Sequence, residues 1–419
     1  MKDKTLSKHY GQLIGLVDPW EVAAVDLSHS EQEVRIELRH RPGAPLKCPE
    51  CGERCPGYDT RERRWRHLDT MQYQTTLIAR VPRMRCPEHG IRQVEVPWAE
   101  PGSRFTALFE ALVIDWLREA SFAAVARQIG LSWDQVAGIQ ERAVRRGLAR
   151  REHRYPRRIG VDETSFQRRH EYVTTIHDLD TGEVVYVADE RRREVLDTFY
   201  EGPGEGACSR LEVVTMDMWA PYIASTRAYV PDADSKIVFD KFHVAKHLGD
   251  AVDKVRRQEH RELRAQGDYR LARTKYHWLQ NPQAMNRRRR QEFNKLRRGR
   301  LRVARAWVLK EEAMALWGYQ RRGWAERGWQ RWYDWAIRSR LEPVKRVARM
   351  IKTHWSGVIN AATTHITNAR AEGLNSRIQW IKRMACGYRN RERFRNAIYF
   401  HLGGLDLYPE NYQSAHSIS

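Results

Sequence analysis

The spacing of hydrophobic and polar residues changes along the chain and divides it into five zones. Residues 1–100 contain one short alternating run, VRIEL at Val34–Leu38, which predicts a strand. Residues 101–150 and 251–350 place apolar side chains at helical spacing. Residues 156–250 alternate β-branched runs with turn signals, and residues 351–410 return to one long helical pattern. We therefore expect several domains, one of them an α/β domain interrupted by a helical insertion.

The zone at residues 156–250 predicts a mixed β-sheet flanked by helices. A first strand is expected at RRIGVDETSF, followed by EYVTTIHDL and VVYVADE, which a DTGE turn joins into a hairpin. LEVVTMD predicts a further strand, PYIASTRAYV a helix and SKIVFDKFHV another strand. This alternation of strands and helices is typical of an α/β core.

The charge of the chain favours a polyanionic partner. Its 74 Lys and Arg against 53 Asp and Glu give a net charge of +21, and residues 251–350 alone carry 28 basic and 10 acidic residues. Neutralising phosphates releases condensed counterions, so nucleic acid is the favoured partner. The same zone holds seven of the 15 tryptophans, which we expect to fill the core of a helical bundle rather than to stack on unpaired bases.

Targeting and membrane signals are not expected in this sequence. No apolar run approaches the ~20 residues that a membrane span requires. The first residues, MKDKTLSKHYGQLIGLV, lack the apolar centre of a signal peptide. We therefore expect a cytoplasmic, nucleoid-associated protein without a membrane partner.

Two pairs of ligand residues predict a structural zinc site near the N-terminus. Cys48-Pro-Glu-Cys51 and Cys86-Pro-Glu-His89 each separate two ligands by two residues, and a glycine follows each pair. One tetrahedral zinc can take two ligands from each such turn, and no position then stays open for chemistry. Cys55 is the other candidate for the fourth ligand in place of His89, or is an ordinary buried thiol.

Residues 121–146 have the pattern of a helix-turn-helix. Apolar residues mark one face of a first helix, Gly130-Leu-Ser132 predicts the turn, and Ser132 suits the N-cap of a second helix. In this motif the second helix enters the major groove of DNA, whereas an ordinary antiparallel helix pair is the alternative. The residues expected to be exposed on this helix and to contact bases or phosphates are Trp133, Gln135, Gln140, Arg142, Arg145 and Arg146.

Three carboxylates occupy positions that suit a site for two metal ions. Asp162 lies within the first strand of the predicted sheet, Asp217 ends a later strand, and Glu372 lies on the helix of the last zone. Buried strands rarely tolerate an ionised carboxylate unless it is paired or bound to metal. Such a site suits two magnesium ions, for which manganese can substitute, ~3.5–4 Å apart beside a scissile phosphodiester. The basic residues expected to flank the backbone of bound DNA are Arg370, Arg377, Lys382 and Arg383.

Other acidic residues of the same zones compete with this triad. Asp178 and Asp180 fall in the hairpin turn, where aspartate bonds to nearby backbone. Asp240 lies close to His243 in FDKFHV and is the main rival, and either of these two residues could assist the site.

Five stretches of the chain occur in an order that is typical of a known family. They are Cys48-Pro-Glu-Cys51-Gly, Ile159-Gly-Val-Asp162-Glu, Val214-Thr-Met-Asp217-Met-Trp, Phe239-Asp-Lys-Phe-His243-Val and Asn368-Ala-Arg-Ala-Glu372-Gly-Leu-Asn-Ser. On these stretches the chain resembles the DDE transposases of bacterial insertion sequences, in particular the ISL-three group. The resemblance implies a ribonuclease-H-like catalytic core with a helical insertion between the second and third acidic residues. It also implies Asp162, Asp217 and Glu372 as the catalytic and magnesium-binding triad, and recognition of terminal inverted repeats by the zinc and helix-turn-helix segments.

The expected protein is multidomain and has an α/β catalytic core. We expect a zinc-binding module at 1–100, a helix-turn-helix domain at 101–150, a catalytic domain at 156–250 and 351–410, and a basic, Trp-rich insertion at 251–350. The expected activity is cleavage of double-stranded element ends and transfer to target DNA, by a homodimer because two ends must be cut together. Two alternatives stay open: a sequence-specific DNA-binding regulator with an inactive catalytic fold, and a ribonuclease-H-like nuclease or resolvase.

Overall fold

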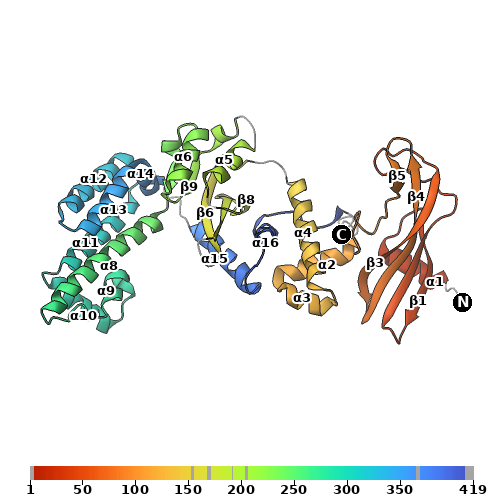
Figure 1. Ribbon diagram of the computed structural model, residues 1–419, viewed down its shortest axis with the longest axis horizontal. Coiled ribbons are helices and arrows are strands. Elements are labelled where there is room, and N and C mark those ends of the chain that lie inside the picture. Colours follow the sequence, from red (N-terminus) through yellow and green to blue (C-terminus); the bar gives the residue numbers. More distant parts are fainter. Residues whose placement is uncertain are drawn as a thin grey trace. The chain divides into compact units, whose positions relative to one another are not determined.

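The chain folds into two compact units, described in a computed structural model (Figure 1). The first unit comprises Met1–Glu152 with Ile381–Ser419, and the second comprises His153–Trp380. The expected catalytic segment 351–410 is thus divided between the two units. The structure describes residues 4–151, 155–167, 171–190, 192–202, 206–364 and 369–410. Within these ranges, no helix combines the length and the apolar character that crossing a membrane requires.

The first unit begins with a helix and a five-stranded sheet. Its elements are α1 (Lys4–Ile14), β1 (Trp20–Ser28), β2 (Glu33–His40), β3 (Gly57–Thr70), β4 (Tyr73–Cys86) and β5 (Gly90–Gln93). The strand order is β1-β2-β4-β3, with β5 beside β4, and only β2 and β4 pair in parallel. The strand predicted at Val34–Leu38 is confirmed within β2, where Val34, Ile36 and Leu38 face the core.

The long β3–β4 hairpin was not predicted from the sequence. The first eight residues of β3, GYDTRERR, are all exposed, so they carry charges on both faces rather than an alternating apolar pattern. Strand prediction depends on that alternation, which appears only where one face of a strand is buried. The partner β4 does alternate, with Leu77, Ala79 and Val81 buried.

Helices complete the first unit. They are α2 (Ala107–Glu119), α3 (Phe122–Ile129), α4 (Trp133–Arg150) and, near the C-terminus, α16 (Arg391–Leu402), which packs on α4. Gly130 ends α3 in the left-handed region, with φ 67°, a conformation that glycine adopts without steric cost. The Ser132 hydroxyl accepts the N–H of Gln135, and the Gln135 side chain accepts the N–H of Ser132. The predicted start of the second helix is confirmed.

The second unit is built on a mixed sheet with strand order β10-β9-β6-β7-β8. Its strands are β6 (Arg158–Gln167), β7 (Glu171–Asp178), β8 (Val184–Ala188), β9 (Val213–Met216) and β10 (Ile237–Phe239). The strands β6, β9 and β10 are parallel, whereas β7 and β8 run antiparallel to their neighbours. The shorter helical elements around it are α5 (Arg193–Glu201), η1 (Cys208–Arg210), α6 (Ala220–Tyr229) and α7 (Ala233–Lys236). The predicted mixed sheet with flanking helices is confirmed.

One predicted strand is too long. The stretch SKIVFDKFHV forms a strand only at Ile237–Phe239, because Asp240 then caps a helix by accepting the N–H of Phe242 at 2.9 Å. His243 is therefore a helical residue in its first turn. This change of structure places Asp240 and His243 at the end of the parallel strands.

The described residues of the insertion form helices joined by loops, and none of them is in a strand. It and the following segment contain α8 (Lys241–Ala265), α9 (Lys275–Leu279), η2 (Pro282–Ala284), α10 (Arg287–Arg298), α11 (Arg302–Ala315), η3 (Leu316–Gly318), α12 (Arg322–Arg338), α13 (Glu342–Thr353), α14 (Trp355–Thr364) and α15 (Ala369–Met384). Trp278, Trp307, Trp329 and Trp332 are buried in one continuous core with the sheet, as expected for most tryptophans of this zone. Trp324 and Trp335 remain exposed.

Candidate functional sites

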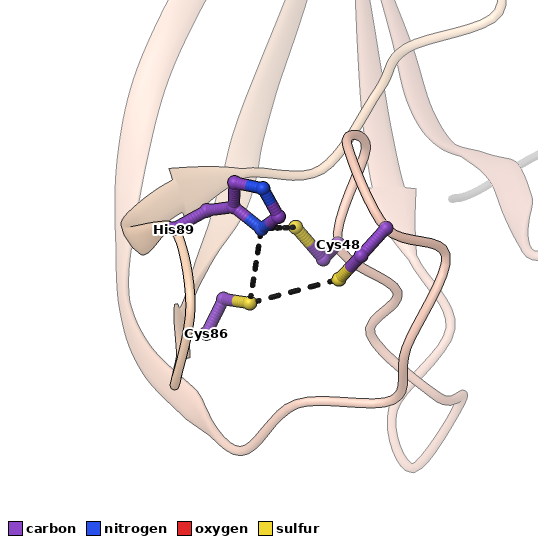
Figure 2. Close-up of side chains that lie close together, drawn as sticks. Cys48, Cys86 and His89 are labelled. Atoms are coloured by element: carbon purple, nitrogen blue, oxygen red, sulfur yellow. Dashed lines mark hydrogen bonds between the residues drawn. The ribbon is translucent and has the colours of Figure 1, made fainter.

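Cys48, Cys51, Cys86 and His89 meet at one point of the first unit. Figure 2 shows Cys48, on the loop before β3, pointing toward Cys86 at the end of β4 and His89 just before β5. The three measured separations are 3.8 Å from Cys48 Sγ to His89 Nδ1, 3.7 Å from Cys51 Sγ to Cys86 Sγ, and 3.5 Å from Cys86 Sγ to His89 Nδ1. Ligands ~2.3 Å and ~2.0 Å from a tetrahedral zinc would lie about 3.5–3.8 Å apart. The quartet therefore has the dimensions of a structural zinc site.

The geometry groups His89, rather than Cys55, with the other three candidate ligands. Cys55 is buried, but its thiol lies 3.5 Å from the carbonyl oxygen of Glu53 and the residue is not part of the quartet. Nδ1 of His89 faces the thiols, while Nε2 lies 3.4 Å from the Glu50 carboxylate, which also pairs with Arg92. A carboxylate beside the second ring nitrogen orients a ligand histidine and raises its basicity. The backbone N–H of His89, as the main cause, lowers the pKa of the Cys86 thiol to about 6, which favours the thiolate that binds metal.

The helix-turn-helix residues expected to contact DNA differ in how exposed they are. Trp133, Gln135 and Arg145 are exposed on α4, as expected. Gln140 is only 3% exposed and the Arg146 side chain only 8%, so the expectation that these two are available to DNA is wrong. The Arg142 side chain is 24% exposed and is paired with Glu110. For Arg142 and Arg146 the cause is a buried ion-pair network that the sequence pattern does not reveal.

Glu110 is the centre of this network. Its carboxylate, 1% exposed, accepts hydrogen bonds from the Ser103 hydroxyl at 2.8 Å, from Arg142 at 2.6 Å and from Arg146 at 3.1 Å. Arg146 also pairs with Glu100 and donates to the carbonyl of Leu407, and the combined acidic groups raise its pKa against the opposing effect of burial. The network ties α2 and α4 together beneath the exposed face of α4.

Glu110→Ala is expected to destabilise the helix-turn-helix by about 3–5 kcal/mol, because it leaves two arginines without their buried carboxylate. Hydrogen exchange of peptides from residues 107–150, measured by mass spectrometry, should show the loss locally. Glu119→Ala, at an exposed position of the same helix, is the control and should change the local stability by less than about 0.5 kcal/mol. Equal exchange rates in the two variants would contradict a structural role for the network.

In the second unit, Asp162 and Asp217 lie on two parallel strands. Asp162 lies in β6, and Asp217 directly follows the adjacent strand β9. Oδ1 of Asp162 accepts the N–H of Glu163 at 2.7 Å, and Oδ1 of Asp217 accepts the N–H of Met218 at 2.6 Å. Each of these bonds holds one carboxylate oxygen against the backbone N–H of the next residue.

His243 links these carboxylates electrostatically. Its Nδ1 lies 2.9 Å from Oδ1 of Asp217, and that contact, with further attraction from Asp240 and Asp162, raises the pKa of His243 against the opposing effect of burial. At Asp162, burial has the largest effect and raises the pKa, while the charge of His243 lowers it. The sequence marked Asp240 and His243 as neighbours of the site, and the structure places His243 against Asp217.

Asn375 is the residue that sequence reasoning missed. Its Nδ2 donates to Oδ2 of Asp162 at 2.5 Å, and its Oδ1 accepts the hydroxyl of Thr164 at 3.1 Å. Asn375 lies on α15 one turn after Glu372, so these bonds bring that part of α15 to the Asp162 end of the sheet. The side chains of Glu372 and Arg370 lie outside the described residues, although the backbone of both is helical. A polar residue one turn from a candidate carboxylate was the available signal.

The remaining basic residues expected on α15 differ in their surroundings. Arg377 and Arg383 are exposed. Lys382 is half-buried, its ammonium lies 6.0 Å from the centre of the Phe394 ring, and burial lowers its pKa. Asp178 and Asp180 have the local role predicted for them, since the N–H of Asp180 donates to the Asp178 carboxylate at 2.7 Å in the hairpin turn.

Comparison with known proteins agrees with this order of modules. A model of the DDE domain of ISL3 transposases, described as "Transposase", matches residues 159–398, more than half of the chain. The helix-turn-helix domain of transposase family ISL3 matches residues 94–144, and the zinc-finger of transposase IS204/IS1001/IS1096/IS1165 matches residues 44–89. The chain belongs to the ISL3 family of DDE transposases, and it is a DNA transposase enzyme with a zinc ribbon and a DNA-binding helix-turn-helix.

Two curated relatives are similar over most of their length. The transposase for insertion sequence element IS1001 of Bordetella parapertussis is 29% identical over 376 residues, which cover 86% of this chain and 92% of that protein. The transposase for insertion sequence element IS1557 of Mycobacterium tuberculosis is 29% identical over 392 residues, covering 85% and 86%. The similarity thus extends through all three modules.

Proposed function

We propose that this transposase binds the terminal inverted repeats of its own insertion sequence, and that Asp162, Asp217 and Glu372 catalyse strand cleavage and transfer with two magnesium ions. The observation that carries the proposal is the convergence at one end of the second sheet. There, the carboxylates of Asp162 on β6 and Asp217 after β9 both raise the pKa of His243. Asn375 on α15, one turn after Glu372, donates a hydrogen bond to Asp162.

The donor set fits divalent oxygen-binding cations. Asp162 is a carboxylate whose ionised form burial disfavours, so a nearby cation would stabilise it. Carboxylate oxygens are the ligands that magnesium takes in phosphoryl-transfer sites, with positions left for phosphate oxygens. Two such ions, when bound, supply an activated water or 3′-hydroxyl and stabilise the leaving oxygen.

The residues of the chain have separate tasks in this proposal. Asp162, Asp217 and Glu372 bind the cations, and Asn375 holds one oxygen of Asp162 so that its carboxylate keeps one orientation. His243 holds Asp217 through the 2.9 Å contact. Positioning of this kind matters because small displacements of reacting groups cost large factors in rate.

Recognition of the element ends is assigned to the first unit. Trp133, Gln135 and Arg145 are the exposed members of the residues first expected on α4, and the second helix of this motif enters the major groove. Gln140 and Arg146 are excluded from that role by their burial. Arg377, in the second unit, is proposed to contact the DNA backbone beside the carboxylates, and Arg383, in the first unit, is proposed to contact the DNA backbone as well. Because two ends must be cut together, a homodimer is proposed to act on the DNA.

An end-cleavage assay tests this function. The purified full-length protein is incubated with Mg²⁺, a labelled duplex carrying the element's terminal sequence and a supercoiled target plasmid. The expected result is cleavage at the end, followed by joining of the labelled 3′-end to the plasmid. Cleavage without joining would support a hydrolytic nuclease instead, and cleavage that is independent of divalent ions would overturn the two-metal mechanism.

A further inference from the structure

Helix α10 carries an unusual concentration of positive charge. Residues 287–302 include nine Lys and Arg but one acidic residue, Glu292. All seven basic residues within the helix itself are exposed: Arg287, Arg288, Arg289, Arg290, Lys295, Arg297 and Arg298. Figure 1 places α10 at the end of the insertion that is remote from the sheet of the second unit. This helix is therefore separate from the carboxylate site.

The helix is anchored by one fully buried apolar residue, with Leu296 packed partly against the same core, and its opposite face is basic. Phe293 is 1% exposed and packs edge-to-face between Trp278 and Trp307, with ring centroids 5.2 and 5.0 Å away. At 3.6 residues per turn, Arg287, Lys295 and Arg298 fall on the side of the helix away from Phe293. The anchor thus holds this basic face toward solvent.

The charges are poorly neutralised within the protein. Glu292 faces Arg288 and His277, each at 3.3 Å, while Arg289 and Arg290 donate to neutral oxygens of Gln280 and Gln283. For Arg287, Lys295, Arg298 and the following Arg300, no acidic partner lies within 4.0 Å among the residues that the structure describes. A group of exposed cations without acidic partners is available to an external polyanion.

The charges in the first turn of the helix do not serve helix stability. Four consecutive arginines occupy the first turn, and the helix has no acidic residue there. Cations at a helix N-terminus oppose the macrodipole, so this arrangement costs helix stability. A sequence selected only for a stable helix would place Asp or Glu at these positions.

We propose that the face of α10 formed by Arg287, Lys295, Arg298 and the adjoining Arg300 is a second DNA-binding surface, which contacts the phosphate backbone of duplex DNA independently of sequence. The inference rests on the proposed function in that the enzyme acts on duplex DNA. The helix is about 18 Å long at ~1.5 Å per residue. Over that length a duplex presents about ten phosphate charges, one per ~1.7 Å of axis. Arginine and lysine are the usual ligands of such phosphates, which fix position but carry no sequence information.

The salt dependence of DNA binding tests this surface. The full-length triple variant Arg287→Gln, Lys295→Gln, Arg298→Gln is compared with the unchanged protein on an element-end duplex and on an unrelated duplex of equal length. Each lost phosphate contact lowers the slope of log K against log [salt] by about 1, so the slope should fall by about 2 to 3 on both duplexes. The ratio of the two affinities should stay the same.

The control variant removes the same charge from another part of the insertion. Arg257→Gln, Arg346→Gln, Arg349→Gln changes three exposed arginines that pair with Asp253 or Glu342, and its slope should change by less than 1. Equal slopes in the two triple variants, or a change confined to the element-end duplex, would overturn the proposal. If the first triple variant is misfolded by circular dichroism, Arg298→Gln alone should lower the slope by about 1, and an unchanged slope would overturn it.

The same titrations separate this inference from the proposed function. If the unchanged protein shows no preference for the element-end duplex, end recognition fails. The slopes on the unrelated duplex still decide whether α10 contacts the backbone.

Discussion

Asp162→Asn is expected to lower cleavage of element-end DNA by about 10³-fold or more, while the protein still folds and still binds the DNA. The change removes one of the carboxylates proposed to hold the metal ions but keeps the shape of the side chain. Burial raises the pKa of Asp162 and disfavours its ionised form, so the neutral amide removes that cost. The amide has one acceptor oxygen for the N–H groups of Glu163 and Asn375, which opposes this gain, so thermal stability should change little. The measurements are cleavage under single-turnover conditions, binding by electrophoretic mobility shift, and a thermal melt.

Asp180→Asn is the matched control for this variant. Asp180 has the same side chain but lies in the exposed turn between two strands of the same sheet, β7 and β8, where it pairs with Arg158 at 2.7 Å. Its cleavage rate should stay within about twofold of the unchanged protein, as expected for a surface position outside the site. Cleavage by Asp162→Asn at more than about a tenth of the original rate would contradict the assignment of Asp162 as a catalytic residue.

Features encoded in short stretches of sequence could be predicted well. The turn and the N-cap of α4 depend on Gly130, Ser132 and Gln135, which lie next to one another, and the structure has them as expected. The strands β6 to β9 were likewise visible because β-branched runs and turn residues are local signals. The zinc quartet also depends on spacing within two short turns, and only the choice between His89 and Cys55 required coordinates.

Features that depend on contacts distant in sequence could not be predicted. The burial of Arg146 follows from carboxylates at Glu100 and Glu110, 46 and 36 residues away, so a helical wheel of α4 alone made it appear exposed. The bond between Asn375 and Asp162 spans 213 residues, and the sequence marks only a polar residue one turn after Glu372, not its partner. In both cases the sequence identifies a polar residue on a helix. The fold determines whether that side chain is exposed to solvent, binds a ligand or pairs with a buried group.

Cys48→Ser is expected to remove zinc from the protein and to unfold the metal-binding end of the first sheet. Two thiolates, the His89 imidazole and one weak hydroxyl do not hold the ion as three thiolates and the imidazole do. Structural zinc supplies roughly 10–16 kcal/mol in small zinc-finger peptides. Cys48 and Cys86 are also buried in the apolar cluster of that sheet, so loss of the ion exposes apolar surface together with the ligands. Zinc content should fall from about one ion per chain to near zero. Hydrogen exchange should rise in the peptides covering residues 44–55 and 84–93.

Cys55→Ser separates loss of zinc from loss of a buried thiol. Cys55 is buried in the same cluster as Cys48 but lies outside the quartet, so its replacement should cost stability without removing the ion. This variant should keep about one zinc per chain, and the exchange of residues 84–93 should stay close to that of the unchanged protein. The sheet that carries Asp162 belongs to the other compact unit, so hydrogen exchange in that sheet should be the same in both variants. If Cys48→Ser retained its zinc while Cys55→Ser lost it, Cys55 rather than Cys48 would be the ligand, and the quartet as assigned would be wrong.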